Sequence, residues 1–123
     1  MSATNDLFTI TKIDHKDESV QAALSINTDS DILKGHFPGH PVVPGACMLQ
    51  IIKEVLESAL GGSFQLKKAD HLKFMSLVDP TNISEVQLEI DYRLQDDNSI
   101  YITSKLSNED TVCFKLQGVF AKV

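Results

Sequence analysis

Apolar and polar residues alternate through most of the chain, and one central segment breaks this pattern. Residues 7–13 (LFTITKI) alternate and predict a half-buried β-strand, and residues 19–26 (SVQAALSI) predict a second strand after the polar turn DHKDE. We expect these two strands to form a hairpin. The polar, turn-rich residues 27–35 then lead into the central segment.

The central segment, residues 45–60, predicts one long helix. It is rich in Ala, Leu, Met, Gln, Lys and Glu, and no glycine or proline interrupts it after its first residue. Pro44 fits the start of a helix and Gly61 and Gly62 fit its end, the preference that helices have at their two termini. Apolar residues cover most of the cylinder, which predicts burial on more than one side. The remaining narrow polar stripe consists of Gln50, Lys53, Glu54 and Glu57.

After the helix the pattern returns to period two. Residues 64–78 predict one or two strands. Three further strands are predicted at residues 86–94, 99–106 and 111–123. In the first of these three, apolar and polar residues alternate throughout, so one face of the sheet is dry. The order of elements predicts one α+β domain over residues 1–123, a five- or six-stranded antiparallel sheet wrapped around one long central helix.

Composition and charge narrow the classes of partner. Apolar residues make up 42% of the 123 residues and charged residues 23%, as in ordinary globular proteins. The chain has 11 Lys and Arg against 17 Asp and Glu, a net charge of -6, which repels nucleic acids and anionic lipid headgroups. We therefore expect no nucleic-acid partner.

The apolar stretches are too short to predict a membrane protein. Charged residues interrupt all of them, and none reaches the roughly 20 residues that a membrane span requires. The N-terminus MSATNDLFTI lacks the basic region followed by an apolar region that marks a secretory signal. The expected location is the cytoplasm.

The cysteines and histidines do not indicate a metal site. Cys47 and Cys113 lie in apolar segments and are expected to be small buried hydrophobes. Of the four histidines only His36 and His40 are close in sequence, and Pro38 between them breaks any helical face. Because a metal needs three or four converging ligands, we expect neither a metal nor another cofactor.

The loop before the helix, GHFPGHPVVPG at residues 35–45, is the most specific stretch of the chain. Proline fixes φ and glycine supplies turns that other residues resist, so this loop would hold His36 in one place. A neutral imidazole titrates near working pH and suits a general base. The helix N-terminus at Gly45 and Ala46 offers unpaired N–H groups and a positive dipole end, which suit a developing oxyanion.

This loop resembles the GHFPxxPxxPG motif of the hot-dog-fold 3-hydroxyacyl-acyl carrier protein dehydratases of fatty-acid synthesis, where it leads into the central helix. The chain fills each fixed position of that motif, with Gly35, His36, Phe37, Pro38, Pro41, Pro44 and Gly45. The order of strands and helix is also the family's order. The segment LKFMSLVDPTN at residues 72–82 is similar to the family's segment of type ARFxxPVxPGD.

The resemblance implies a dehydratase that converts a 3-hydroxyacyl group on an acyl carrier protein to a trans-2-enoyl group. This reaction needs a base at C2, a site for the negative charge on the thioester oxygen, and an acid for the departing hydroxyl. His36 is then the base, Gly45 and Ala46 donate to the oxyanion, and Phe37 contacts the substrate. The apolar helix and the dry sheet face would line an acyl tunnel.

The chain departs from the family at the acid. In the family a Glu or Asp stands on the helix fourteen positions after the histidine, and that position here is Gln50. An amide cannot donate the proton. Glu54 stands four residues later, on the same helix face and about 6 Å further along the axis, and helical side chains lean toward the N-terminus. We predict that Glu54 supplies the displaced carboxyl and that Gln50 orients a water or the substrate hydroxyl.

The resemblance also implies partners. Family members form dimers that place the loop of one subunit against the helix of the other, so we expect a homodimer or a larger homo-oligomer of dimers. The expected substrate is an acyl thioester on an acyl carrier protein. Such carriers are acidic, and the candidate docking residues are Lys67, Lys68 and Lys73, which are equally well explained as ordinary exposed strand charges.

Two other functions stay open. One is a catalytically impaired acyl-binding homologue, or one subunit of a heterodimer whose partner contributes the missing carboxylate. The other is a hot-dog acyl thioesterase, in which a carboxylate such as Glu54 activates water against the thioester carbonyl. The GHFPGHPVVPG loop favours the dehydratase or the subunit over the thioesterase.

Overall fold

The computed structural model describes residues 7–28, 43, 45–76, 78–79 and 83–123. Within these residues one helix follows two strands and precedes four more. In chain order they are β1 (Phe8–Lys16), β2 (Ser19–Ile26), α2 (Gly45–Leu60), β3 (Phe64–Phe74), β4 (Glu85–Leu94), β5 (Ser99–Asn108) and β6 (Thr111–Lys122).

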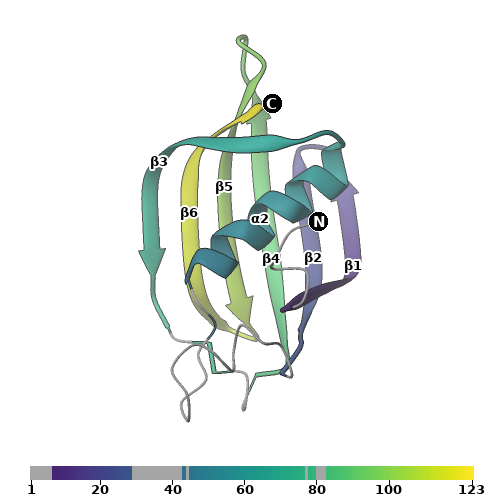
Figure 1. Cartoon of the computed structure of the whole chain (residues 1–123), viewed down its shortest axis with the longest axis vertical. Coiled ribbons are helices and arrows are strands. Elements are labelled where there is room, and N and C mark those ends of the chain that lie inside the picture. Colours follow the sequence, from purple (N-terminus) through teal and green to yellow (C-terminus); the bar gives the residue numbers. More distant parts are fainter. Residues whose placement is uncertain (1–6, 29–42, 44, 77, 80–82) are drawn as a thin grey trace.

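The six strands form one sheet in the order β1-β2-β4-β5-β6-β3, and all neighbouring pairs are antiparallel. The helix α2 crosses one face of the sheet diagonally, and β3 leaves its C-terminal end and returns along the far edge (Figure 1). The α+β architecture of an antiparallel sheet around one helix is therefore confirmed, with six strands.

One side of α2 forms the centre of the core. Its buried residues are Cys47, Met48, Ile51, Ile52, Val55 and Leu56. Burying a large aliphatic side chain contributes about 1.5–3 kcal/mol, so this face holds the helix on the sheet. Ala46 is exposed and Leu49 is only half-buried, so the chain itself buries one side of the helix rather than several as predicted. This helix is not long and apolar enough to cross a membrane.

The first hairpin turns more tightly than the sequence predicted. The turn comprises only Asp17 and Glu18, because β1 continues through most of the predicted turn DHKDE. Asp17 takes the positive φ of 55° that this tight turn needs. The ring Nε2 of His15 lies 2.7 Å from the hydroxyl of Tyr92 on β4, and the Tyr92 amide donates to the Glu18 carbonyl at 2.9 Å. These contacts across the sheet stabilise the extended strand.

The strand β3 follows β6 along its whole length as one strand with two irregularities. Its register shifts between Leu66 and Lys68 and again between Ala69 and His71. At this bend the backbone of β3 comes very close to Gly118 on β6. A Cβ atom at position 118 would overlap the carbonyl oxygen of Lys68. Glycine is therefore required here by the close approach of two backbones.

We expect Gly118→Ala to lower the free energy of unfolding by about 1–3 kcal/mol, the usual cost of overpacking. The added methyl would meet backbone atoms of β3, which cannot turn aside as a flexible side chain can. Urea unfolding measures the change. The control is Gln117→Ala on the opposite face of β6, which should change stability by less than about 0.5 kcal/mol. Equal effects of the two variants would contradict the close approach.

Candidate functional site

The polar stripe of α2 contains one carboxylate with a structural role. The Oε2 atom of Glu57 accepts a hydrogen bond from the Phe64 amide at 2.7 Å and lies 3.1 Å from Lys53 Nζ. Between helix and strand, Gly61 and Gly62 both have φ of 82°, the left-handed conformation that glycine adopts at little cost. Glu57 thus joins the end of α2 to the first residue of β3.

Gln50 and Glu54 lie at the boundary between the core and the solvent. Both are half-buried, and the residues next to them, Ile51 and Val55, are fully buried. Four residues correspond to a rise of about 6 Å, so the two polar side chains occupy successive turns of one face. A carboxyl group and an amide group are therefore held side by side at the edge of an apolar interior.

The N-terminus of α2 has an aromatic wall. A Cβ atom at Gly45 would lie 2.5 Å from Cε1 and Cζ of Phe74, so only glycine permits this contact. The Phe74 ring also packs on Phe114, with ring centroids 4.8 Å apart, and remains 55% exposed. The first N–H groups of a helix have no partner within the helix. The helix that carries the Gly45 and Ala46 amides thus begins beside a partly exposed aromatic ring.

The two segments that resemble the dehydratase motifs lie next to each other. The amide of Val43, near the end of the loop at residues 35–45, donates to the carbonyl of Val78 at 2.9 Å. Both valines are buried, with exposures of 2% and 0%. Val78 belongs to the segment at residues 72–82, and the same segment contributes the ring that contacts the first residue of α2. Two stretches far apart in the sequence therefore meet at the start of the helix.

The predicted site residues divide into two groups. Gly45, Ala46, Gln50 and Glu54 lie on the first turns of α2. His36 and Phe37 lie outside the described residues, and so does the rest of the loop before Val43. The helix therefore carries the proposed oxyanion donors and the proposed carboxyl on one element, and the position of the base stays a prediction.

A model of the ApeI-like family, described as ApeI dehydratase, matches residues 12–115 of the chain. The chain belongs to the ApeI-like dehydratase family. It is also similar to two 3-hydroxyacyl-[acyl-carrier-protein] dehydratases named FabZ. The FabZ of Xylella fastidiosa (strain M12) is 22% identical over 114 residues, which cover 85% of this chain and 71% of the relative. The FabZ of Lactobacillus helveticus (strain DPC 4571) is 24% identical over 110 residues, which cover 84% and 73%.

Solved structures place this ApeI-like chain in the hot-dog fold. A chain of the dehydratase heterocomplex ApeI:P from Xenorhabdus doucetiae superposes with a TM-score of 0.73 at 15% identity, covering 93% of this chain and 97% of that chain. The virulence protein Cj0977 from Campylobacter jejuni superposes with a TM-score of 0.69 at 10% identity, covering 98% and 78%. At such identities the likeness confirms the predicted hot-dog fold and nothing further.

The two thiols of this ApeI-like protein have the character of core residues. Cys47 and Cys113 are both free and buried, as predicted. Burial raises the pKa of each thiol, so both stay protonated and are poor nucleophiles. In the part of the chain that the structure describes, no three His, Cys, Asp or Glu residues lie close enough together to hold a metal ion.

Two residues near the candidate site have contacts that the sequence does not predict. Glu57 was one member of a polar stripe, and its bond to the Phe64 amide depends on how β3 leaves the helix. Phe74 lies in the segment LKFMSLVDPTN, yet its contact with Gly45 joins distant parts of the chain. Gly45 was the available sequence signal for the contact with Phe74. Pro44 already favours the start of a helix, and a residue without a side chain after it permits a close neighbour.

We expect Glu57→Ala to lower the free energy of unfolding by about 1–3 kcal/mol, because the Phe64 amide loses its acceptor near the core. Most of this loss comes from the hydrogen bond, since partly exposed ion pairs contribute little. Glu57→Gln keeps an acceptor oxygen and should lose less. Thermal and urea unfolding of the three proteins measure the order. An alanine variant as stable as the wild type would refute the structural role of Glu57.

Proposed function

We propose that the protein is a dehydratase that converts a 3-hydroxyacyl group on an acyl carrier protein to a trans-2-enoyl group, in fatty-acid or related acyl-chain biosynthesis. The observation that carries this proposal is the half-buried Glu54 on α2, one turn beyond Gln50 at the edge of the apolar core. The family match over residues 12–115 and the FabZ relatives support the reaction class.

In the proposed reaction each group has one task. His36 removes the proton from C2, and the amides at Gly45 and Ala46 hold the negative charge that grows on the thioester oxygen. Glu54 donates a proton to the C3 hydroxyl, the C3–O bond breaks, and water leaves. Gln50 orients the hydroxyl or an intervening water.

Aromatic residues complete the proposed site. Phe37 follows His36 and contacts the acyl thioester. The ring of Phe74 beside Gly45 keeps water away from the oxyanion amides, and an electrostatic interaction is stronger where water is excluded. The apolar inner face of the sheet then receives the acyl chain.

We expect Glu54→Gln to lower the rate of enoyl formation by about 10²- to 10⁴-fold, the usual contribution of a general acid. The assay follows the enoyl product from a 3-hydroxyacyl carrier-protein substrate. Glu57→Gln is the matched control on the same helix face and should keep a near wild-type kcat. The double variant Gln50→Glu/Glu54→Gln, which returns the acid to the position the family uses, should recover part of the activity. A Glu54→Gln variant with full activity would remove Glu54 from the mechanism.

A second candidate function is a subunit of a dehydratase heterocomplex. Two observations favour it: Gln50 stands at the family's acid position, and a similar solved structure is the heterocomplex ApeI:P. The chain would then be inactive alone and active only when a partner supplies the carboxylate. The same assay separates these readings. Interconversion of 3-hydroxyacyl and 2-enoyl thioesters by the purified chain supports the dehydratase, inactivity supports the subunit, and release of free thiol supports a thioesterase.

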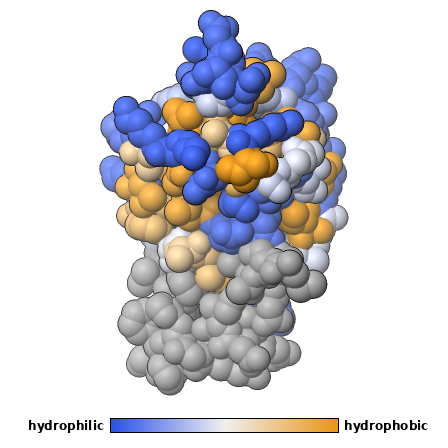
Figure 2. Space-filling model, turned by 45° about the horizontal axis from the view of Figure 1, so that its top comes forward, coloured by the Kyte–Doolittle hydropathy of each residue, from blue (hydrophilic) through white to orange (hydrophobic). Residues whose placement is uncertain are grey.

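We also infer that two copies of the chain pair along β3. This strand is an edge of the sheet, and exposed apolar residues lie at its end, Leu72 (43%) and Phe74 (55%), and directly after it, Met75 (47%). Figure 2 displays apolar surface on the left of the view, the side on which β3 lies. An exposed apolar edge strand invites pairing with another chain. A second copy there would lie beside Phe74 and the start of α2.

We expect Leu72→Asp to shift the protein from dimer to monomer in sedimentation velocity experiments, because a charge would be buried in the interface. Leu94→Asp is the control, since Leu94 is 67% exposed at the end of β4, away from β3. The control should leave the oligomeric state unchanged. Dimers that persist in the Leu72 variant, or a monomeric wild type, would contradict the inferred interface.

A further inference from the structure

The strand register places one residue from each of the six strands in a row across the sheet. Each member is paired with the next: β1 with β2, β2 with β4, β4 with β5, β5 with β6, and β6 with β3. From β1 to β3 the row is Asp14, Gln21, Glu89, Lys105, Lys115 and Lys73. One end of the row is acidic and the other end consists of three adjacent lysines.

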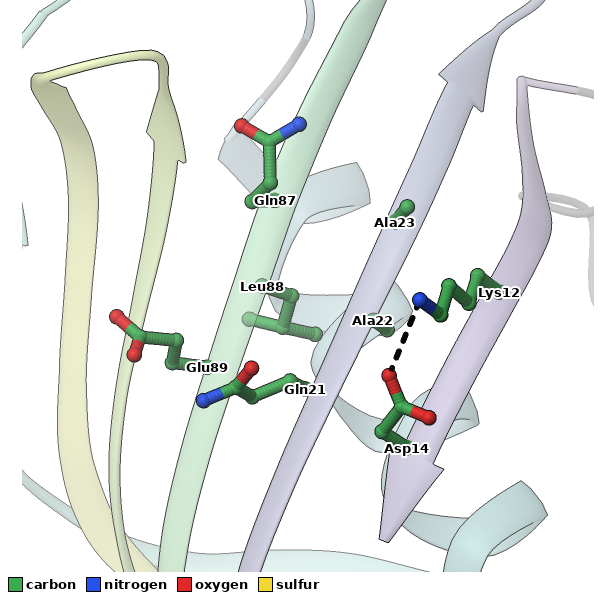
Figure 3. Close-up of a pocket in the computed structure, with 8 residues that line it drawn as sticks. All are labelled: Lys12, Asp14, Gln21, Ala22, Ala23, Gln87, Leu88 and Glu89. Atoms are coloured by element: carbon green, nitrogen blue, oxygen red, sulfur yellow. Dashed lines mark ion pairs between the residues drawn. The ribbon is translucent and has the colours of Figure 1, made fainter.

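The row lies on the outer face of the sheet, away from α2. Lys115 stands between Phe114 and Leu116, which are both fully buried under the helix, so its own side chain points outward. Phe74 contacts the helix, so Lys73 before it also points outward. Figure 3 shows the first half of the row, where Asp14, Gln21 and Glu89 lie on the neighbouring strands β1, β2 and β4 and the helix lies behind the sheet.

Two of the three lysines at this end of the row are not neutralised within the described part of the chain. Lys105 pairs with Glu89 at 3.1 Å. Lys115 and Lys73 are directly opposite each other and form no ion pair with any described residue. Like charges directly opposite on neighbouring strands destabilise a sheet. This pair therefore weakens the fold in a chain whose net charge is -6, and an external anion would relieve the repulsion.

The other two lysines predicted to form a docking site are already bonded. Lys68 Nζ lies 3.3 Å from the carboxylate of Asp70, and Lys67 Nζ donates to the side chain of Gln65 at 3.2 Å. Of the three predicted candidates, Lys73 alone belongs to the row. The register of the strands, rather than proximity in sequence, therefore defines the basic surface.

A hollow of about 250 Å³ gives this surface a receptive shape. Lys105 and Lys115 line it together with Thr103 and Gln117, and Glu89 and Asp91 form its rim on β4. A carboxylate that entered the hollow would meet the ammonium group of Lys115 and polar side chains, beside the ion pair of Lys105 with Glu89. Glu89 and Asp91 repel an anion, so favourable contact with an anionic partner is restricted to the lysine side of the hollow. That restriction favours a compact acidic patch on a protein over a nucleic acid or an anionic membrane, which present extended charge.

We propose that Lys73 and Lys115, with Lys105 beside them, form a docking surface for an acidic protein. Lys73 directly precedes Phe74, so this surface begins one residue from the ring that packs on Gly45. The last step rests on the proposed function: the acidic protein is the acyl carrier protein that presents the substrate. Such electrostatic docking speeds association and weakens with salt.

The test compares two double variants with the same change of charge on the same face of the sheet. Lys73→Gln/Lys115→Gln removes the docking pair, and Lys12→Gln/Lys16→Gln removes two lysines of β1 at the opposite edge. Each protein is assayed with a 3-hydroxyacyl carrier-protein substrate and with the same acyl group as an N-acetylcysteamine thioester. The docking variant should lose about tenfold in kcat/KM for the carrier substrate at low salt, through KM, and keep its activity on the small thioester.

A stability measurement separates docking from a structural role. Because the docking variant loses a repulsive pair, its unfolding midpoint should equal or exceed that of the wild type. In the control variant, kcat/KM should differ from that of the wild type by no more than about twofold, both for the carrier substrate and for the small thioester. Equal losses in both variants, or no loss for the carrier substrate, would overturn the docking proposal.

Failure of the proposed function gives a different result. If the wild type converts neither substrate, direct titration with the purified carrier protein still tests the docking surface. Weaker binding by the Lys73→Gln/Lys115→Gln variant, and unchanged binding by the control, then supports it. Absent or unchanged binding overturns it, and so does binding of duplex DNA or anionic vesicles through these lysines in place of the carrier.

Discussion

The arrangement of the molecule depends on the packing of one face of α2 against the inner face of the sheet. The helix also makes contacts at both of its ends. At its start the ring of Phe74 lies directly on Gly45, and at its end Glu57 accepts a hydrogen bond from the first amide of β3. These two contacts join both ends of α2 to residues of β3.

Local signals predicted most of the fold. The helix begins and ends as predicted because Pro44 and Gly61 bracket it, and the strands follow the period-two pattern. The predicted extent of the first turn was wrong, because cross-strand contacts such as that of His15 with Tyr92 extend β1 into polar residues. The irregular register of β3 was also not predictable, since it depends on where β6 provides a glycine. Pairing partners distant in the chain decide these features, and periodicity does not report them.

The candidate site shows the same division. Counting along the helix from the loop motif was enough to identify Gln50 and Glu54 as neighbours on one face, because helix geometry is regular. It could not show that Glu57 accepts a hydrogen bond from the Phe64 amide, since that contact depends on the path of the chain after the helix. Nor could it reveal the contact between the Phe74 ring and Gly45. The roles of His36 and Phe37 rest on the motif, and they stay predictions.

The alternation of the edge strand connects the two faces of the molecule. Successive side chains of a strand point to opposite faces, so Phe74 packs on the helix start while Lys73 projects outward. The proposed acid adds a constraint on the inner side. Glu54 stands about 6 Å further from the first helix amides than Gln50 does, and its side chain leans back toward them by the usual tilt of helical side chains. A carboxyl displaced by one turn can thus serve the same substrate without any movement of the helix, provided that Gln50 fills the space between them.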